Sequence, residues 1–173
     1  MAHENSRNKY DKKDSLLLGN RAEKSFVQLA RRLGWRVSPS SKRQNIDEHW
    51  DYQIERDSLS FKVEVKSLKR IHREDEQAQS ELTWVELHGV RPRDTGWLFG
   101  KADLIAFEKH DSFILVRKSD LLSVVNRKVD LVRKVREPTQ ALYKIYSRPG
   151  RKDKLTLLPM KDIQNIQFEE WRK

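Results

Sequence analysis

The sequence predicts a single α/β domain in which helices flank a mixed β-sheet. Its length of 173 residues is typical of one domain. Residues 14–34 repeat apolar side chains at the spacing of a helix. Residues 50–54 and 61–66 alternate apolar and polar side chains, as half-buried strands do. A helix followed by short strands and further helical stretches favours the α/β class.

The first helix is expected to follow a flexible arm formed by residues 1–13. Gly19 weakens its first turns, so the helix is expected to begin as late as Asn20, and Gly34 is a stop signal. Glu23 lies about 90° from the centre of the apolar stripe, where its carboxylate can reach a neighbouring sheet. The stripe consists of Ala22, Phe26, Leu29 and Leu33.

The next segment reads as three strands. Residues 35–40 form a short strand that ends near Pro39, and residues 41–49 form a polar loop. A four-residue loop then joins residues 49–54 to the strand "FKVEVK" in an antiparallel hairpin. One face of this hairpin is expected to be buried through Trp50, Tyr52, Phe61, Val63 and Val65.

The remainder of the chain is read more coarsely. Residues 70–81 are polar and form a loop or a short helix. Residues 82–90 are expected to add a third strand to the same sheet, and Trp97 is expected on an exposed loop. A hairpin turns at Lys109–Asp111, and Ser119 or Asp120 caps a helix over residues 121–129. Two strands surround the Pro-Gly turn within residues 141–160, and residues 161–168 form a short helix.

Composition favours a polyanionic partner. Lys and Arg number 36 against 26 Asp and Glu, a net charge of +10, and basic side chains release counterions from phosphates. The absence of cysteine excludes disulfides and thiolate metal sites. The polar N-terminus has no signal-peptide pattern, and no apolar run approaches about 20 residues. A soluble cytoplasmic protein is therefore expected.

Two carboxylates are predicted to face each other across the hairpin. In its antiparallel register Asp51 falls opposite Glu64, with Cβ atoms about 5 Å apart. Such carboxylates repel unless a positive charge lies between them, and Mg²⁺ takes carboxylates, waters and substrate phosphate as ligands. Lys66 lies on the same strand face as Glu64, where its ammonium can stabilise charge on a phosphate. The tripeptide Glu64-Val65-Lys66 alone is uninformative, because about one Glu-x-Lys is expected by chance.

An acidic helix residue, an Asp on one strand and Glu-x-Lys on the next resemble the PD-(D/E)XK nuclease superfamily. The resemblance covers residues 14–125 and implies a restriction-endonuclease-like αβββαβ core, with residues 126–173 as a basic C-terminal extension packed on it. It implies that Glu23, Asp51, Glu64 and Lys66 are catalytic, and that Asp51, Glu64 and the carbonyl of Val65 bind Mg²⁺, for which Mn²⁺ substitutes. Trp50 stands where the family often has proline. The small basic chain further resembles Holliday junction resolvases and phage nucleases, which implies a homodimer and selectivity for branched DNA.

Other residues keep two interpretations each. Glu86 is an additional ligand or base, or a surface salt-bridge residue. His49 touches substrate and His88 supports Glu86, or both are unrelated to function. Asp103 is read as structural. Trp84 and Trp97 stack on unpaired bases, or pack against the protein.

The basic residues chosen as phosphate contacts are Lys69, Arg70, Arg148, Arg151, Lys152 and Lys154. The chain is therefore interpreted as a Mg²⁺-dependent DNA nuclease, with RNA as a second candidate substrate. The alternative is a non-catalytic nucleic-acid-binding module that uses the same basic surface.

Overall fold

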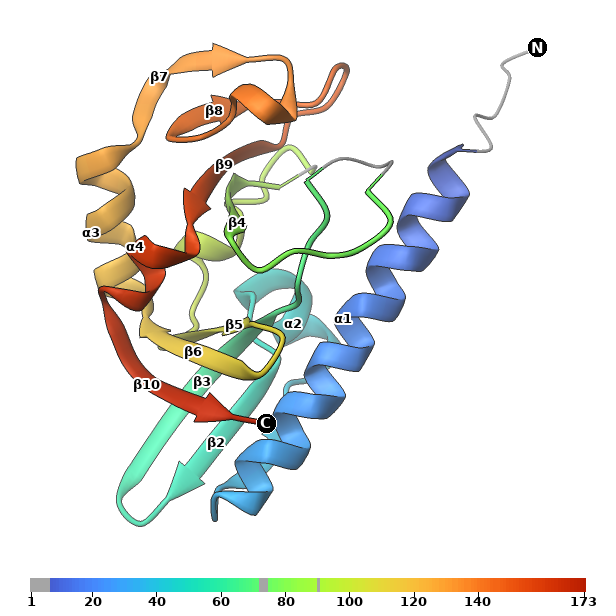
Figure 1. The fold of residues 1–173 in the computed structure, drawn as a ribbon. Helices are drawn as coiled ribbons and strands as arrows, with labels where there is room; N and C mark the ends of the chain where they lie inside the picture. The colour runs from blue at the N-terminus through green and yellow to red at the C-terminus, as the bar shows by residue number, and fades with distance from the viewer. Residues whose placement is uncertain (1–6, 72–74, 90) are drawn as a thin grey trace.

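The computed structural model of the chain describes residues 7–71, 75–89 and 91–173. It is a mixed α/β fold with two mostly antiparallel sheets and four α-helices among these residues (Figure 1). The elements follow the chain in this order: α1 (Arg7–Arg32), β1 (Arg36–Pro39), α2 (Lys42–Glu48), β2 (Tyr52–Arg56), β3 (Leu59–Lys66), β4 (Leu82–His88), η1 (Trp97–Phe99), β5 (Leu104–Glu108), β6 (Ser112–Arg117), α3 (Lys118–Lys128), β7 (Asp130–Val135), η2 (Pro138–Gln140), β8 (Lys144–Tyr146), β9 (Lys154–Pro159), α4 (Met160–Gln164) and β10 (Gln167–Arg172).

The first sheet has six strands in the order β1-β2-β3-β5-β6-β10, and the second has four in the order β4-β9-β8-β7. In the first sheet β3 and β5 are parallel, and the other neighbours are antiparallel. In the second sheet β7 and β8 are parallel. Because β3 and β5 run the same way, the chain must cross over between them.

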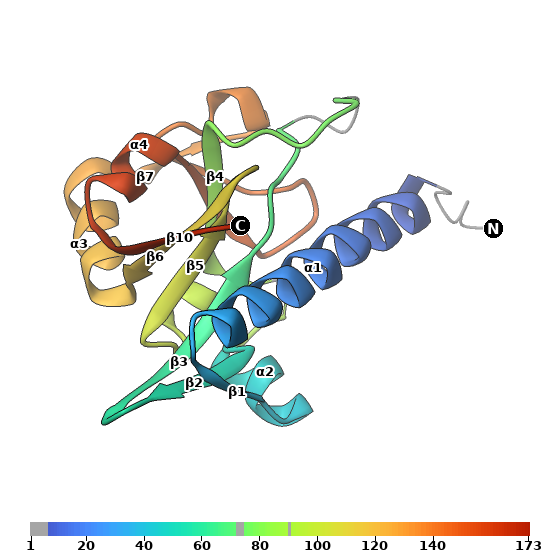
Figure 2. The same ribbon diagram turned by 60° about the horizontal axis from the view of Figure 1, so that its bottom comes forward.

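Two hydrophobic cores lie on opposite faces of the first sheet. One packs α1 against the sheet, and the other lies between the sheet and α3, α4 and the second sheet. Both ribbon views show α1 and the α3–α4 pair on opposite sides (Figures 1 and 2). Phe26 of α1 is fully buried and stacks on Trp171 of β10 with ring centroids 5.4 Å apart. This aromatic contact fixes α1 across the sheet, because large buried rings contribute most to a core.

Several predicted elements are confirmed. The first helix, β1 ending at Pro39, the β2–β3 hairpin, the β5–β6 hairpin and the β8–β9 pair occur as expected. The turn at Lys109–Asp111 is closed by a hydrogen bond from the Lys109 N–H to the Ser112 carbonyl, 2.7 Å long. A short helix follows β9, as predicted, but it ends at Gln164 and gives way to β10.

The first helix begins earlier than predicted. α1 starts at Arg7 and continues through Gly19, so residues 7–13 of the expected arm are helical, while residues 1–6 lie outside the described residues. The expected polar loop 41–49 contains α2, whose N-terminus has a capping box between Ser41 and Gln44. Two reciprocal hydrogen bonds therefore stabilise a helix that buries no residue of its own.

Three strand and loop predictions are wrong. β4 belongs to the second sheet, not to the sheet of β2 and β3. Trp97 lies in η1 and is 6% exposed, packed on Phe107, rather than on an exposed loop. Trp50 packs in the core between the first sheet and α3, α4 and the second sheet, away from Tyr52 and Phe61. It precedes the first residue of β2, so the alternation of the strand does not fix its side.

Other differences concern the second half of the chain. α3 begins at Lys118 with Arg117 as its N-cap residue and no side-chain cap, so neither Ser119 nor Asp120 caps it. The expected αβββαβ core has its second helix after the third strand. At this place, between β3 and β5, the described residues instead form the strand β4 and the short helix η1. The boundary expected at residues 125 and 126 lies within α3, and the segment after it supplies three strands of the second sheet and β10 of the first.

None of the helices formed by the described residues combines the length and apolarity needed to cross a bilayer.

Candidate active site

The candidate site lies where β2 begins and β3 ends. Tyr52 pairs with Val63, and the Asp51 N–H donates to the Val63 carbonyl over 2.8 Å. One step further along this register, Asp51 lies across from Glu64, as the hydrophobic pattern predicts. Both carboxylates are almost withdrawn from solvent, with Asp51 9% and Glu64 7% exposed.

The Asp51 carboxylate is held by two hydrogen bonds. Its Oδ1 accepts from Asn45 Nδ2 and its Oδ2 from the Val65 N–H, each at 2.7 Å. Burial raises the pKa of Asp51 to about 7, and the neighbouring Glu64 carboxylate adds to the rise. Asn45 belongs to α2, so a polar loop over residues 41–49 does not predict this contact. The Ser41–Gln44 capping box is the sequence signal that could have found it.

Lys66 is joined to Glu64 by a short ion pair, and its Nζ lies 4.9 Å from the centre of the Trp97 ring. Burial lowers the pKa of Lys66, but the carboxylates of Glu64, Asp51 and Glu86 together outweigh burial and hold this pKa above its usual value, with Glu64 contributing most. The ammonium is therefore charged at neutral pH and fixed beside the two acids.

Glu23 approaches the same place from α1. The Tyr52 hydroxyl donates to Glu23 Oε2 over 3.1 Å. Burial raises the pKa of Glu23, the hydrogen bond from Tyr52 lowers it, and Glu64 raises it again. The flanking position predicted from the helical wheel is thus the one that Glu23 occupies.

A pocket of about 250 Å³ brings these residues together. Its wall includes Glu23, Asp51, Glu64, Val65 and Lys66, and Gly19, Asn45, His49, Ser67 and Lys69 complete it. Acidic, basic and amide groups from α1, α2, β3 and the segments next to the strands therefore converge on one cavity. Such a cluster of titratable groups with shifted pKa values is typical of a functional site.

Among the described residues, no three His, Asp or Glu side chains are grouped closely enough to form a metal-ligand set. The donors present are the Asp51 and Glu64 carboxylates and the carbonyl of Val65. This oxygen set fits Mg²⁺, which usually keeps several waters and takes one or two carboxylates. The Glu64 carboxylate raises the pKa of Asp51, which shows that the two negative charges repel each other. A divalent cation between two such carboxylates would relieve this repulsion.

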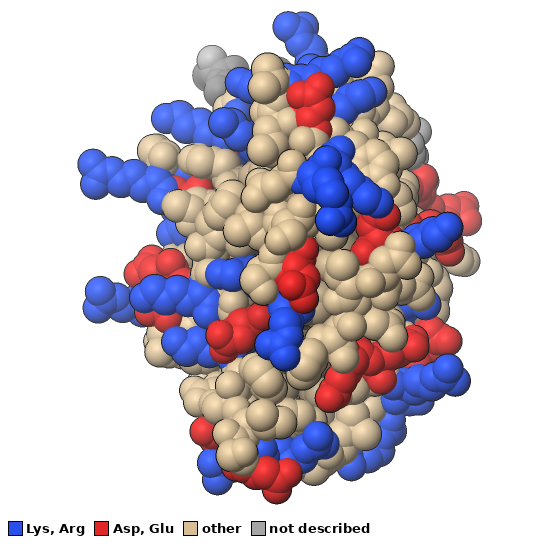
Figure 3. Space-filling model, turned by 90° about the vertical axis from the view of Figure 1, so that its left-hand side faces the viewer, with Lys and Arg blue, Asp and Glu red and all other residues tan. Residues whose placement is uncertain are grey.

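The basic residues chosen from the sequence have different surroundings. Lys69 lines the pocket, whereas Arg148 is paired with the fully buried Asp153. Arg70 makes an interaction of its own within the protein. Arg151 and Lys152 are exposed at the turn before β9, and Lys154, the first residue of β9, is exposed beside them. On the face that carries α3, Lys and Arg are spread over the whole surface with Asp and Glu between them (Figure 3).

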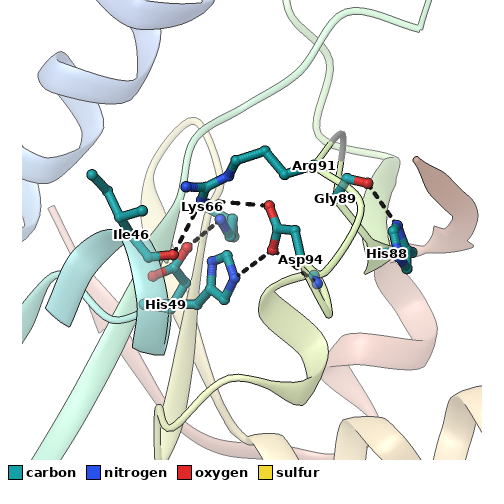
Figure 4. Close-up of polar contacts among 9 residues, drawn as sticks. Ile46, His49, Lys66, His88, Gly89, Arg91 and Asp94 are labelled. Atoms are coloured by element: carbon teal, nitrogen blue, oxygen red, sulfur yellow. Dashed lines mark hydrogen bonds and ion pairs between the residues drawn. The ribbon is translucent and has the colours of Figure 1, made fainter. Parts of the chain in front are cut away.

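His49 forms part of a second polar cluster beside Lys66 (Figure 4). It ends α2 in a left-handed conformation with φ of 54°, and its Nε2 lies 2.9 Å from Asp94 Oδ1. Arg91 contacts the other Asp94 oxygen at 3.6 Å and donates to the Ile46 carbonyl over 3.4 Å. The loop after β4 is thus tied to the end of α2, a link with no sequence signal.

The remaining candidates separate into two groups. Asp103 accepts from the Lys62 N–H over 2.7 Å and joins β3 to β5, which agrees with a structural role. The His88 ring lies 2.6 Å from the neighbouring Gly89 carbonyl, through its Nδ1. Glu86 and Trp84 line a second cavity beside the first. Burial raises the pKa of Glu86, and Lys66 lowers it in part.

No protein-family model matches the sequence. No curated protein matches it either. Among solved structures, the chain is similar to a bacterial homing endonuclease with a TM-score of 0.47 and 16% sequence identity. The match covers 63% of this chain and 72% of the endonuclease chain. A likeness at this level does not define the fold family.

Proposed function

We propose that this chain is a Mg²⁺-dependent DNA nuclease of the PD-(D/E)XK type, in which Mn²⁺ also serves. The observation that carries the proposal is the convergence of Asp51, Glu64 and Lys66, with Glu23 at their flank, on one pocket. Like charges directly opposite each other on paired strands are destabilising, and a Mg²⁺ ion bound by both carboxylates would offset this repulsion.

Each residue has a distinct task in this proposal. Asp51, Glu64 and the Val65 carbonyl would hold the metal ion, which activates water and offsets charge on the phosphate. Lys66 orients Glu64 through their ion pair and places a fixed positive charge beside the scissile phosphate. Asn45 and the Val65 N–H fix the Asp51 carboxylate. Glu23 is hydrogen-bonded to Tyr52 and completes the acidic wall.

A gel series tests the proposal. Linear duplex, single-stranded, flap and four-way junction DNA are offered to the wild type and to Asp51→Asn, each with Mg²⁺ or with EDTA. Cleavage by the wild type with Mg²⁺ alone is expected, and preference for the junction would extend the proposal to branched DNA. Full cleavage in EDTA or by Asp51→Asn would refute the metal site. DNA binding without any cleavage would favour the non-catalytic binding module. Size-exclusion chromatography of the same samples tests for a homodimer.

A further inference from the structure

A second cavity of about 240 Å³ adjoins the candidate metal site. The two cavities share one wall, formed by His49, Glu64, Lys66, Ser67 and Lys69. The opposite wall of the second cavity comes from the second sheet, through Thr83, Trp84, Glu86 and Leu155, and Trp97 closes it. A strand whose phosphate lies at Asp51 and Glu64 therefore has room to continue between the two sheets.

Lys69 stands on the wall that the two cavities share. Within the described part of the chain, its ammonium makes no hydrogen bond or ion pair, although the residue is half-buried. Burial and then the nearby Lys66 lower the pKa of Lys69 to about 8, and Glu108 and Glu86 offset this in part. Its backbone is fixed, because its carbonyl accepts from the Gln79 N–H at 3.1 Å and from Gln79 Nε2 at 3.0 Å. An ammonium group whose backbone is fixed and which has no carboxylate partner is suited to binding a phosphate group of a ligand.

Trp84 offers an aromatic wall to the same cavity. It alternates on β4 with Val85, which is fully buried in the core on the other side of the strand. Its ring lies against Tyr146, with centroids 5.5 Å apart and planes tilted by 37°. The ring is thus supported by Tyr146 of β8, the strand beyond β9 in the second sheet, but it is only half-buried. Trp97, the other tryptophan in this cavity, is 6% exposed beneath Lys66 and offers no free face of similar size.

The charges in the second cavity are arranged by position. Glu64 is paired with Lys66, so among the described residues that line this cavity Lys69, on the shared wall, is the lysine without an ion pair. Glu86 lies on the wall formed by the second sheet, on the same strand as Trp84, where its carboxylate can accept an N–H from a base edge. The cavity is also smaller than the roughly 300–1,000 Å³ of typical drug-sized sites, which suits one base.

We propose that this second cavity binds the nucleotide next to the scissile phosphate, with Lys69 on its phosphate and Trp84 stacked on its base. This inference rests on the proposed nuclease function and adds a substrate class to it. A base inside a duplex cannot enter such a cavity without leaving its stack. The substrate is therefore DNA that carries an unpaired nucleotide at the cut, as in a single strand, a flap or a branch point.

Ligand binding in EDTA tests the subsite without requiring cleavage. The probes are deoxyadenosine 5′-monophosphate, deoxyribose 5-phosphate and inorganic phosphate, titrated into protein with ¹⁵N-labelled tryptophan. The indole signal of Trp84 is identified by its loss in Trp84→Phe. We expect the nucleotide to shift this signal and to bind about 5-fold or more tightly than deoxyribose 5-phosphate, because stacking adds affinity.

The variants separate the two contacts. Lys69→Met should weaken the nucleotide and the sugar phosphate by the same factor. Trp84→Leu should remove the difference between them, and Trp84→Phe, which keeps a ring against Tyr146, should retain it. Equal binding of nucleotide and sugar phosphate to the wild type, or no shift at Trp84, would overturn the subsite. If the protein cleaves DNA but does not bind the nucleotide at this cavity, the nuclease proposal stands and the subsite is refuted. If it binds the nucleotide at this cavity but never cleaves DNA, the nuclease proposal is refuted.

Discussion

Asp51 Oδ2 accepts a hydrogen bond from the backbone N–H of Val65 over 2.7 Å. This bond connects the residue before β2 to the strand that carries Glu64, so the two carboxylates keep a fixed relation to each other. Asn45 holds the other Asp51 oxygen. An asparagine at position 51 can keep both hydrogen bonds, because the Asn45 amide can turn its oxygen toward the new donor. Asp51→Asn therefore removes charge with little change of shape.

Asp51→Asn is expected to stabilise the metal-free protein at neutral pH. The pKa of Asp51 is about 7 in the folded protein against 3.8 as its ordinary value. Between these values the folded chain binds more protons than the unfolded chain, so the free energy of unfolding falls as pH rises from about 4 to about 7. The variant should weaken this fall and melt at a higher temperature than the wild type at pH 8 in EDTA. Thermal melts across this pH range measure the effect.

Mg²⁺ should reverse the order of the two proteins. A ligand that binds only the folded state raises its stability, so Mg²⁺ at pH 8 should raise the melting temperature of the wild type and leave that of Asp51→Asn almost unchanged. An equal rise in both proteins would place the bound metal elsewhere.

The hairpin that bears the candidate site could be predicted because several constraints agree. A one-residue slip would turn Tyr52, Ile54, Val63 and Val65 toward the other face, so their burial fixes the register. The opposition of Asp51 and Glu64 follows from that register and from the loop length. Glu23 could be placed because its angle on the helix depends on local geometry alone.

The parts that were missed depend on contacts distant in sequence. β10 pairs with β6 across more than 50 residues, and its polar sequence, QFEEWR, gives little strand signal by itself. β4 alternates like any half-buried strand, and only its partner β9 assigns it to the second sheet. Trp97 is buried because Phe107 and Lys66 cover it, which its loop-like neighbours do not reveal.

Lys66→Ala is expected to lower the cleavage rate by roughly 10²-fold or more, by analogy with the loss of one electrostatic stabiliser. DNA affinity should fall much less, because the charge acts where the reaction occurs. Lys66→Met is the matched control, since its unbranched side chain keeps the packing on Trp97 without the charge. Single-turnover rates and binding in EDTA measure the two effects separately. A rate restored by methionine would assign Lys66 to packing rather than to charge.

The exposed turn before β9 is expected to bind backbone phosphates. Arg148 is excluded from this test because its ion pair with buried Asp153 gives it a structural role. Changing Arg151, Lys152 and Lys154 together to Gln should reduce the slope of log K against log salt by about two to three units, at about 0.9 per lost phosphate contact. Filter binding on duplex DNA across salt concentrations measures the slope.

The matched control removes the same charge from β7, at the far edge of the second sheet, and from the residue that follows it. Arg133, Lys134 and Arg136 are exposed there. Their triple Gln variant should leave the slope within about one unit of the wild type, because these residues lie at the opposite edge of the sheet from β4. Equal losses in both variants would show that DNA responds to net charge and not to the turn.

Gly19→Ala is expected to stabilise the protein while weakening its action on DNA. Gly19 lies inside α1, where alanine is favoured by about 1 kcal/mol. Apart from the adjoining residues and backbone of α1, no atom of the described residues lies within 4 Å of an added Cβ. For a chain of this size the melting temperature should rise by about 2–4 °C. Gly19 also lines the pocket that holds Asp51 and Glu64, so the new methyl group takes space from the substrate and should raise KM more than it lowers kcat.

Ser25→Ala, on the same helix but outside that pocket's wall, is the control and should raise stability slightly without changing KM. A stabilised Gly19→Ala protein with the wild-type KM would show that DNA does not approach α1 at this position.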